Sequence, residues 1–249
     1  MKPTLVLVSI AAAVALTVGL VWHYGVRKPM GGEVVREERA LPPFDRIAIE
    51  GFADLVLVQG SAESISIEGA PEYLRSLRFE VIDGKLVLAN SGARHGWLDI
   101  FNGEARPIHA TLTFRKLDAI SVEGAAKLRA DRLETDRLAV SASGATKLTI
   151  SALDAKELAV SGSGAFKMDI AGRTVAQQIR ISGAGDYRAA KLQSEAAKVT
   201  VSGAGRVAIL AEKTLDIDLS GAGSVEYFGN PKVTQDIRGV GRVKKGVAE

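Results

Sequence analysis

The chain has 249 residues, with 32 Lys and Arg, 29 Asp and Glu, three His and no Cys. The absence of cysteine excludes disulfides, thiolate metal sites, cysteine nucleophiles and a lipidated N-terminal cysteine. The formal net charge of +3 comes from Lys2, Arg27 and Lys28, because residues 31–249 carry 29 basic and 29 acidic side chains. This neutral body argues against a nucleic-acid-binding domain.

The N-terminal segment predicts a membrane anchor. Residues 3–26 contain no Asp, Glu, Lys or Arg, and as a helix they would be long enough to cross a bilayer. Trp22 and Tyr24 fall where interfacial aromatic side chains are common, and two cations follow them. We therefore predict a transmembrane or signal-anchor helix over 1–28, with a cleaved signal peptide as the alternative. The Gly, charged and Pro residues that follow predict a linker over 29–43.

After the linker, apolar and polar residues alternate with the period of a β-strand. The stretches "FDRIAIEG", "LVLVQG" and "SISIEG" each end in a glycine, and Asp83-Gly84 predicts a hairpin turn. Residues 91–107 break the alternation and predict a surface loop. We expect one β domain over 44–245, with a short tail over 246–249.

From residue 121 onward, the phrase Ser-Gly-x-Gly or a weaker copy of it returns between apolar residues about every 20 residues. A fixed period of this length indicates stacked supersecondary units. The first serine of each copy and the glycine three residues later give six pairs: Ser121/Gly124, Ser141/Gly144, Ser161/Gly164, Ser182/Gly185, Ser202/Gly205 and Ser220/Gly223.

The apolar residues around each glycine are spaced two apart, as in Leu158/Val160 before Gly164 and Met168/Ile170 after it. Each repeat thus holds two short strands with one inward face, and it has too few apolar residues to form a core alone. The pattern predicts an all-β, parallel β-solenoid with coils of about 18–21 residues. The glycines are expected at a corner that needs positive φ or close backbone approach, and the serines are expected to stack as a hydroxyl ladder.

The entry segment "FDRIAIEGFADLVLVQG", the later "LVLAN" and the tandem "SGAG" coils together resemble a known family of bacterial envelope proteins. Its description is "putative auto-transporter adhesin, head GIN domain", and the resemblance runs from about Phe44 to Val243. It implies a right-handed parallel β-helix that is exported and tethered to an envelope membrane. Many members carry a lipidated cysteine that this chain lacks, so that anchoring here would depend on residues 3–26.

The motifs of common catalytic and cofactor sites are absent from this sequence. The glycines match neither a dinucleotide-binding fingerprint nor a P-loop, and no serine lies in a nucleophile elbow. Calcium-binding repeats need Asp at the same place in successive coils, whereas Asp186 is matched by Arg206 and Ser224. The histidines, His23, His95 and His109, lack the spacing of a metal site. We predict no cofactor, no metal and no catalytic residue.

A glycan-active enzyme is the catalytic alternative, because it needs carboxylates gathered on one groove. The acids of the coils change position from repeat to repeat. The least scattered cluster is His95, Asp99 and Glu104 in the predicted surface loop.

Basic residues recur about three positions after the glycines and predict a cationic stripe: Lys127, Lys147, Lys167, Arg188 and Arg206. Such a stripe could contact anionic glycans or phospholipid headgroups. The alternative interpretation is protection of strand edges and solubility.

These observations together predict a membrane-anchored β-solenoid of the bacterial cell envelope that acts as a non-catalytic binding, adhesin-like or scaffold module. The expected partners are the cytoplasmic membrane, through residues 3–26, and an envelope glycan or another envelope protein, but not nucleic acid. We expect the domain to be exported to the periplasm or the cell surface. A self-assembling, bactofilin-like scaffold is the first alternative, although the charged last coil with Lys244 and Lys245 favours a capped end.

Overall fold

The computed structural model describes residues 35–69, 74, 77–90 and 109–247, which belong to a compact unit spanning 34–249. The predicted anchor over 1–28 and the predicted loop over 91–107 lie outside the described residues, as do His23, His95, Asp99 and Glu104. In the described part, no helix has the length and apolarity needed to span a bilayer.

The fold is all-β, as the alternating pattern predicts. Its strands are β1 (Val35–Ala40), β2 (Arg46–Gln59), β3 (Ser64–Gly69), β4 (Leu77–Ile82), β5 (Lys85–Asn90), β6 (His109–Phe114), β7 (Ala119–Ala142), β8 (Ala145–Gly162), β9 (Ala165–Ile181), β10 (Ala184–Val201), β11 (Arg206–Leu210), β12 (Thr214–Leu219), β13 (Ser224–Phe228), β14 (Lys232–Ile237) and β15 (Arg242–Lys245).

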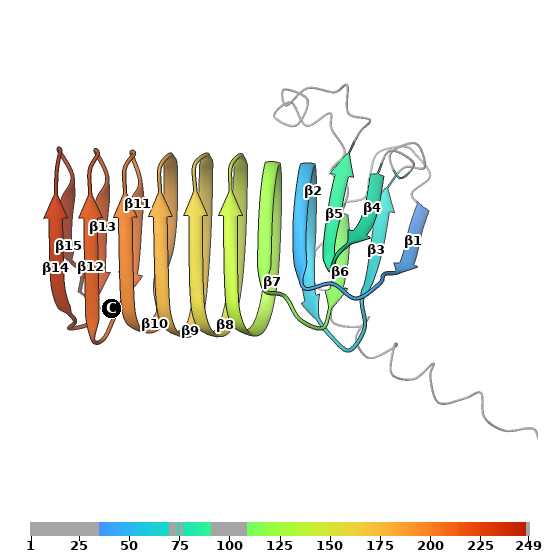
Figure 1. The fold of residues 1–249 in the computed structure, drawn as a ribbon, viewed down its shortest axis with the longest axis horizontal. Coiled ribbons are helices and arrows are strands. Elements are labelled where there is room, and N and C mark those ends of the chain that lie inside the picture. The colour runs from blue at the N-terminus through green and yellow to red at the C-terminus, as the bar shows by residue number, and fades with distance from the viewer. Residues whose placement is uncertain (1–34, 70–73, 75–76, 91–108, 248–249) are drawn as a thin grey trace, which may run out of the picture. The chain divides into compact units, whose positions relative to one another are not determined.

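Successive coils stack in parallel, which confirms the predicted β-solenoid (Figure 1). Strands β7 to β10 are long because each runs along one side of a coil, round a corner and back along the other side. Toward the C-terminus, the two sides become separate strands: β11, β13 and β15 stack on one side, and β12 and β14 on the other.

Antiparallel strands cover the N-terminal end of the solenoid. β3 pairs antiparallel with both β6 and β1, and β4 pairs antiparallel with β5. Here the structure corrects the predicted linker over 29–43, because Val35–Ala40 forms β1 and pairs with β3 along its whole length. The charged residues that suggested a linker lie on an exposed edge strand, where charged side chains discourage pairing with another chain.

The core consists of apolar columns that run from coil to coil. One column contains Leu128, Leu148, Met168, Tyr187, Val207 and Val225, each directly above the last. All of these side chains are buried. Each coil therefore buries its apolar side chains against the next coil, as a solenoid requires.

The corner between coils is built around a glycine, which in five coils belongs to a Ser-Gly-Ala triplet. Each corner glycine lies against the corner glycine of the preceding coil, in the order Gly51, Gly124, Gly144, Gly164, Gly183, Gly203, Gly221 and Gly239. A serine precedes five of these glycines and stacks in the same way: Ser143, Ser163, Ser182, Ser202 and Ser220. The Ser182 backbone N–H, for example, donates to Gly162 O at 2.9 Å.

This register differs from the sequence-based alignment by two residues in part of the repeat. Ser161 pairs with Arg180 rather than Ser182, and Gly185 pairs with Phe166 rather than Gly164. In the segments "SASG" and "SGSG" it is the second serine that occupies the corner. A slip of two residues keeps every inward side chain inward, so alternation alone cannot detect it.

The same two-residue difference corrects three of the predicted corner glycines. Each predicted residue lies two positions after the glycine that holds the corner: Gly185 after Gly183, Gly205 after Gly203, and Gly223 after Gly221. The prediction was wrong here because "SGAG" carries one glycine at the corner and a second one beyond it. Gly223, for example, is buried, and its Cβ would lie 2.9 Å from Val201 Cγ1 and 3.0 Å from Leu219 Cδ1. These second glycines therefore leave room for core side chains just after the corner.

Close approach, rather than positive φ, explains most of the corner glycines. A Cβ on Gly144 would lie 1.8 Å from Gly124 O, and one on Gly164 would lie 2.3 Å from Gly144 O. Within the column, φ is positive at Gly51, Gly124 and Gly239, near the two ends of the stack. Gly205 does not have positive φ, and its Cβ would instead meet buried Ile181 and Val201 side chains.

The stacked serines do not bond to one another as a hydroxyl ladder would require. The Oγ atoms of Ser143, Ser182 and Ser202 donate instead to backbone carbonyls of the preceding coil, at 3.2, 3.4 and 3.5 Å. These contacts are long, so each contributes at most about 1 kcal/mol.

One polar network lies inside the core, between β9, β10 and the end of β11. The Tyr187 hydroxyl donates to Gln177 Oε1 at 3.0 Å, Gln177 Nε2 donates to Ser194 Oγ at 2.8 Å, and Ser194 Oγ donates to Leu210 O at 2.7 Å. Tyr187, Gln177 and Ser194 are all buried. Each polar group has a partner, which removes most of the cost of burying it.

Burial raises the pKa of the Tyr187 phenol above its ordinary value of 10.0, because the anion cannot be solvated there. The unfolded chain then releases this proton near pH 10 while the folded chain retains it. The contribution of Tyr187 to the free energy of unfolding is therefore complete below pH 10. Above that pH we expect the free energy of unfolding to fall by about 1.4 kcal/mol per pH unit. Urea unfolding on either side of pH 10 checks this, with Tyr187→Phe as the comparison. An equally steep loss in the variant would contradict the assignment.

Candidate functional site

A column of cations runs along the outside of the solenoid. Lys127, Lys147 and Lys167 pair directly with one another in β7, β8 and β9. Arg206 on β11 belongs to the same row, after Asp186. We call Lys127, Lys147, Lys167 and Arg206 the cationic column.

Arg188, the fifth residue of the predicted stripe, lies two positions away in the neighbouring row. It pairs with Asp169 in the strand register, and its guanidinium contacts both Asp169 at 4.0 Å and Asp186 at 2.7 Å. In the strand register, Asp186 pairs with Arg206, and Arg206 pairs with Ser224. Within the described residues, no group of three or more His, Asp or Glu could hold a metal ion.

The cationic column contrasts with several other charged rows, in which an acid lies beside a base of the adjacent coil. Lys156 contacts Asp136 at 2.6 Å, Lys213 contacts Glu195 at 2.5 Å, and Arg238 contacts Asp218 at 3.1 Å. In the cationic column, Lys127 contacts Asp54 at 3.7 Å, whereas Lys147, Lys167 and Arg206 form no ion pair within the described part of the chain. Adjacent strands are about 4.8 Å apart, and like charges at that distance repel each other.

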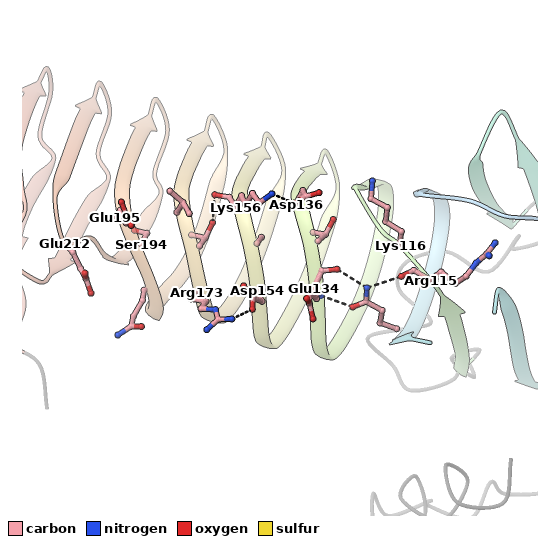
Figure 2. Close-up of a pocket in the computed structure, with 16 residues that line it drawn as sticks. Arg115, Lys116, Glu134, Asp136, Asp154, Lys156, Arg173, Ser194, Glu195 and Glu212 are labelled. Carbon is pink, nitrogen blue, oxygen red and sulfur yellow. Dashed lines mark hydrogen bonds and ion pairs between the residues drawn. The ribbon is translucent and has the colours of Figure 1, made fainter. Parts of the chain in front are cut away.

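A second feature, which we call the corner groove, follows the other bend of each coil. This bend comes about ten residues after the Ser-Gly-Ala corner and is distinct from it. It has a volume of about 790 Å³ and crosses β7, β8, β9 and β10. Two rows of side chains form its walls (Figure 2). One row contains Glu134, Asp154, Arg173 and Gln193, the other Asp136, Lys156, Val175 and Glu195, and the floor between them is Thr135, Ala155, Thr174 and Ser194.

Gln59 closes the N-terminal end of the groove. Its side-chain amide donates to Arg115 O at 3.0 Å and to Glu134 O at 2.9 Å, while Glu134 N–H donates to Gln59 Oε1 at 2.8 Å. The amide therefore takes the place of a backbone peptide between two coils and fixes the end of the groove.

Ion pairs across adjacent coils hold the groove walls. Arg173 bonds to Asp154 and lowers the pKa of that carboxyl, and Lys156 does the same for Asp136. The partner cations have their pKa raised in turn. All four groups therefore remain charged at neutral pH, so the walls present fixed donors and acceptors.

The groove is not evident from the amino-acid sequence, in which the acids of the coils change position from repeat to repeat. Glu134 and Asp154 in fact share one row, and Asp136, Glu195 and Glu212 line the same groove. The signal was a polar or charged triplet about ten residues after each corner glycine: Glu134–Asp136, Asp154–Lys156, Arg173–Val175 and Gln193–Glu195. Alignment of the repeats on their corner glycines brings these triplets into register.

With the coils and their entry strands in place, the chain can be compared with known proteins. A family described as "Putative auto-transporter adhesin, head GIN domain" matches residues 43–231. The chain belongs to this head GIN domain family. The match covers all of β2 to β13, so it includes both the entry strands and the Ser-Gly-Ala triplets. No match was found among the curated proteins.

Solved structures share this head GIN fold. One from Bacteroides fragilis, named a putative adhesin, is 20% identical with a TM-score of 0.79, covering 86% of this chain and 98% of its own. One from Parabacteroides distasonis, named a putative lipid binding protein, is 18% identical with a TM-score of 0.69, covering 87% and 98%. A putative adhesin from Parabacteroides merdae is 18% identical with a TM-score of 0.67, covering 87% and 97%. At these identities the likeness is one of fold.

Proposed function

We propose that this head GIN protein is a non-catalytic binding module of the bacterial cell envelope, and that the cationic column holds its ligand. The ligand would present repeated anionic groups, such as the phosphates of lipid headgroups or of an acidic envelope polymer. Residues 3–26 would tether the exported domain to the cytoplasmic membrane.

The observation that carries the proposal is the stacking of Lys127, Lys147 and Lys167 in three successive coils. The three lysines repel one another in the free protein. Anionic groups that lie over them relieve this repulsion, and the relief adds to the affinity for the ligand. The name of one structural relative, a lipid binding protein, makes anionic headgroups a reasonable first probe.

The groove carboxylates support binding rather than catalysis. A glycosidase needs one carboxylic acid with a raised pKa beside a second carboxylate. In the corner groove, the pKa values of Asp136 and Asp154 are both lowered by ion pairs with Lys156 and Arg173. This environment favours structural carboxylates over a proton donor.

The last coil supports a monomeric module over an end-to-end scaffold. Gln235 and Lys245 occupy inward positions that Ile217 and Tyr227 fill in the preceding coil. Stacking a second copy on this end would enclose these polar groups, which is costly unless each finds a partner. Filaments of residues 34–249 seen by electron microscopy would favour the scaffold instead.

The binding test compares two double variants of residues 34–249. Lys147→Gln/Lys167→Gln removes two charges of the cationic column. Each Lys near an anionic surface contributes about 1 kcal/mol, so we expect binding to phosphatidylglycerol vesicles to weaken about 30-fold. Vesicle co-sedimentation measures this, and competition with soluble polyphosphate distinguishes lipid from free polyanion.

The matched control is Lys198→Gln/Lys213→Gln, which removes the same charge from lysines paired with Asp216 and Glu195. It should bind nearly as well as the unaltered domain. If both double variants weaken binding equally, net charge alone is responsible and the column is not a site.

A further inference from the structure

We propose that the corner groove binds an extended, uncharged glycan, with one sugar unit opposite each coil. The inference does not depend on the cationic column, because none of its four residues lines the groove. It concerns a different class of ligand and therefore a second binding activity.

The shape of the groove suits a linear repeating ligand. Its walls repeat once per coil over β7, β8, β9 and β10, and adjacent parallel strands lie about 4.8 Å apart. This spacing is close to the length of one sugar unit in an extended, β-linked chain. A glycan along the solenoid axis would therefore meet one position of each wall at every unit, although the side chains at these positions differ from coil to coil. The volume of about 790 Å³ is in the usual range for binding sites.

The charges of the groove favour a neutral ligand. Asp136 is matched by Lys156 at 2.6 Å, and Asp154 is bonded by Arg173. Charges of both signs line the groove, so an anionic or cationic ligand would approach like charges as well as opposite ones. A hydroxyl both donates and accepts, so it can bond to either member of each pair without separating them.

The floor of the groove offers little that is polar and free. Thr174 Oγ1 contacts Lys156 O at 3.2 Å and Ala176 O at 3.1 Å, and Ser194 Oγ donates to Leu210 O at 2.7 Å. Ala155 in the floor is buried, whereas Val175 in the adjoining wall is 50% exposed and supplies apolar surface. The C–H face of a sugar ring can lie on this surface while its hydroxyls reach the walls.

An extended peptide fits the groove less well. Peptides usually bind a β-fold by adding a strand to a free edge. At this corner the backbone is already paired on both sides, since Asp154 pairs with Glu134 in β7 and with Arg173 in β9. The ligand must therefore bind through side chains, as a polyhydroxylated chain can.

The test uses the full chain in detergent micelles and isothermal titration calorimetry with defined neutral oligosaccharides, namely β-1,4-linked glucose and β-1,4-linked N-acetylglucosamine series. We expect saturable binding to at least one series. Affinity should rise from the disaccharide to the tetrasaccharide or pentasaccharide and then level off, as the coils of the groove become occupied. No binding in either series, or affinity that does not change with length, would overturn the proposal.

Val175→Asp locates the site, since it removes the exposed apolar contact and adds a negative charge to the wall. We expect it to lower the affinity about tenfold or more. Val58→Asp is the matched control, because Val58 is 40% exposed on β2 and does not line the groove. Melting temperatures of both variants confirm that each remains folded. Equal loss in the two variants, or a loss that appears only in Lys147→Gln/Lys167→Gln, would place the glycan elsewhere and overturn the groove assignment.

Discussion

Gly144→Ala is expected to lower the free energy of unfolding by about 3 kcal/mol or more. The added Cβ would lie 1.8 Å from Gly124 O and 2.8 Å from Gly124 N, distances that no side-chain rotation can relieve. The two coils would have to separate at this corner. Their backbones are paired on both sides of it, from Ala125 with Ala145 onward and through Ser143 N–H to Val122 O at 3.0 Å. Urea unfolding of residues 34–249 measures the loss.

Two companion variants make this result interpretable. Ser143→Ala changes the preceding exposed residue and removes only the Oγ contact to Val122 O at 3.2 Å, so it should cost at most about 1 kcal/mol. Gly205→Ala places a Cβ 3.0 Å from Ile181 Cγ2 and 3.1 Å from Val201 Cγ1, and these side chains can adjust. The expected order of destabilisation is therefore Gly144→Ala, then Gly205→Ala, then Ser143→Ala. If Gly144→Ala is as stable as Ser143→Ala, the coils do not touch at this corner.

Gly185→Ala should destabilise the protein strongly only while Phe166 is present. A Cβ on Gly185 would lie 2.2 Å from Phe166 Cζ, and one on Gly162 would lie 1.9 Å from Phe166 Cε1. The buried ring thus occupies space that the absent side chains leave. Ala126 and Thr146 fill the same row in the two preceding coils, so only the β9 coil needs this room.

A double-mutant cycle measures this dependence. Gly185→Ala is expected to cost about 2 kcal/mol in the natural background, as overpacking does, and little in a Phe166→Ala background. Phe166→Ala alone should cost about 3–5 kcal/mol, because it leaves a cavity. We expect a coupling energy of about 1–3 kcal/mol. Additive losses would show that the ring does not lie against Gly185.

The sequence was sufficient to predict the architecture because two independent periods agree. The alternation of apolar and polar residues marks Leu158/Val160 and Met168/Ile170 as strand positions. The recurrence of the glycine phrase about every 20 residues predicts that these strands stack in parallel. Both predictions hold, since all four side chains are buried and paired with neighbouring coils. The family resemblance is confirmed as well.

The register could not be predicted in the same way. The segment "SGSG" offers Ser161 and Ser163 as equivalent starting points, and the spacing between corner serines is 19 residues from Ser163 to Ser182. A shortened step of this kind comes from the irregular pairing between Ile150 and Leu153, which alternation does not reveal. The same ambiguity explains why Arg188 was predicted in the stripe of cations, two residues from its actual row.

The corner groove was missed for a related reason. Its walls come from the bends of the coils, where the strand period does not apply and side chains of neighbouring residues can face the same space. Glu134 and Asp136 belong to opposite walls although only Thr135 separates them. Only the stacking of coils shows which acid faces which base.

Disulfide formation between introduced cysteines tests the stacking register directly, and the chain has no natural cysteine to interfere. Ser163→Cys/Ser182→Cys places the two thiols at one corner in adjacent coils, within reach of a disulfide. Ser161→Cys/Ser182→Cys places them two residues out of register, too far apart for the bond to form without backbone movement. Under mild oxidation we predict rapid cross-linking of the first pair and little of the second. The reverse result would contradict the Ser-Gly-Ala corner and, with it, the pairing of Asp154 with Arg173 in the corner groove.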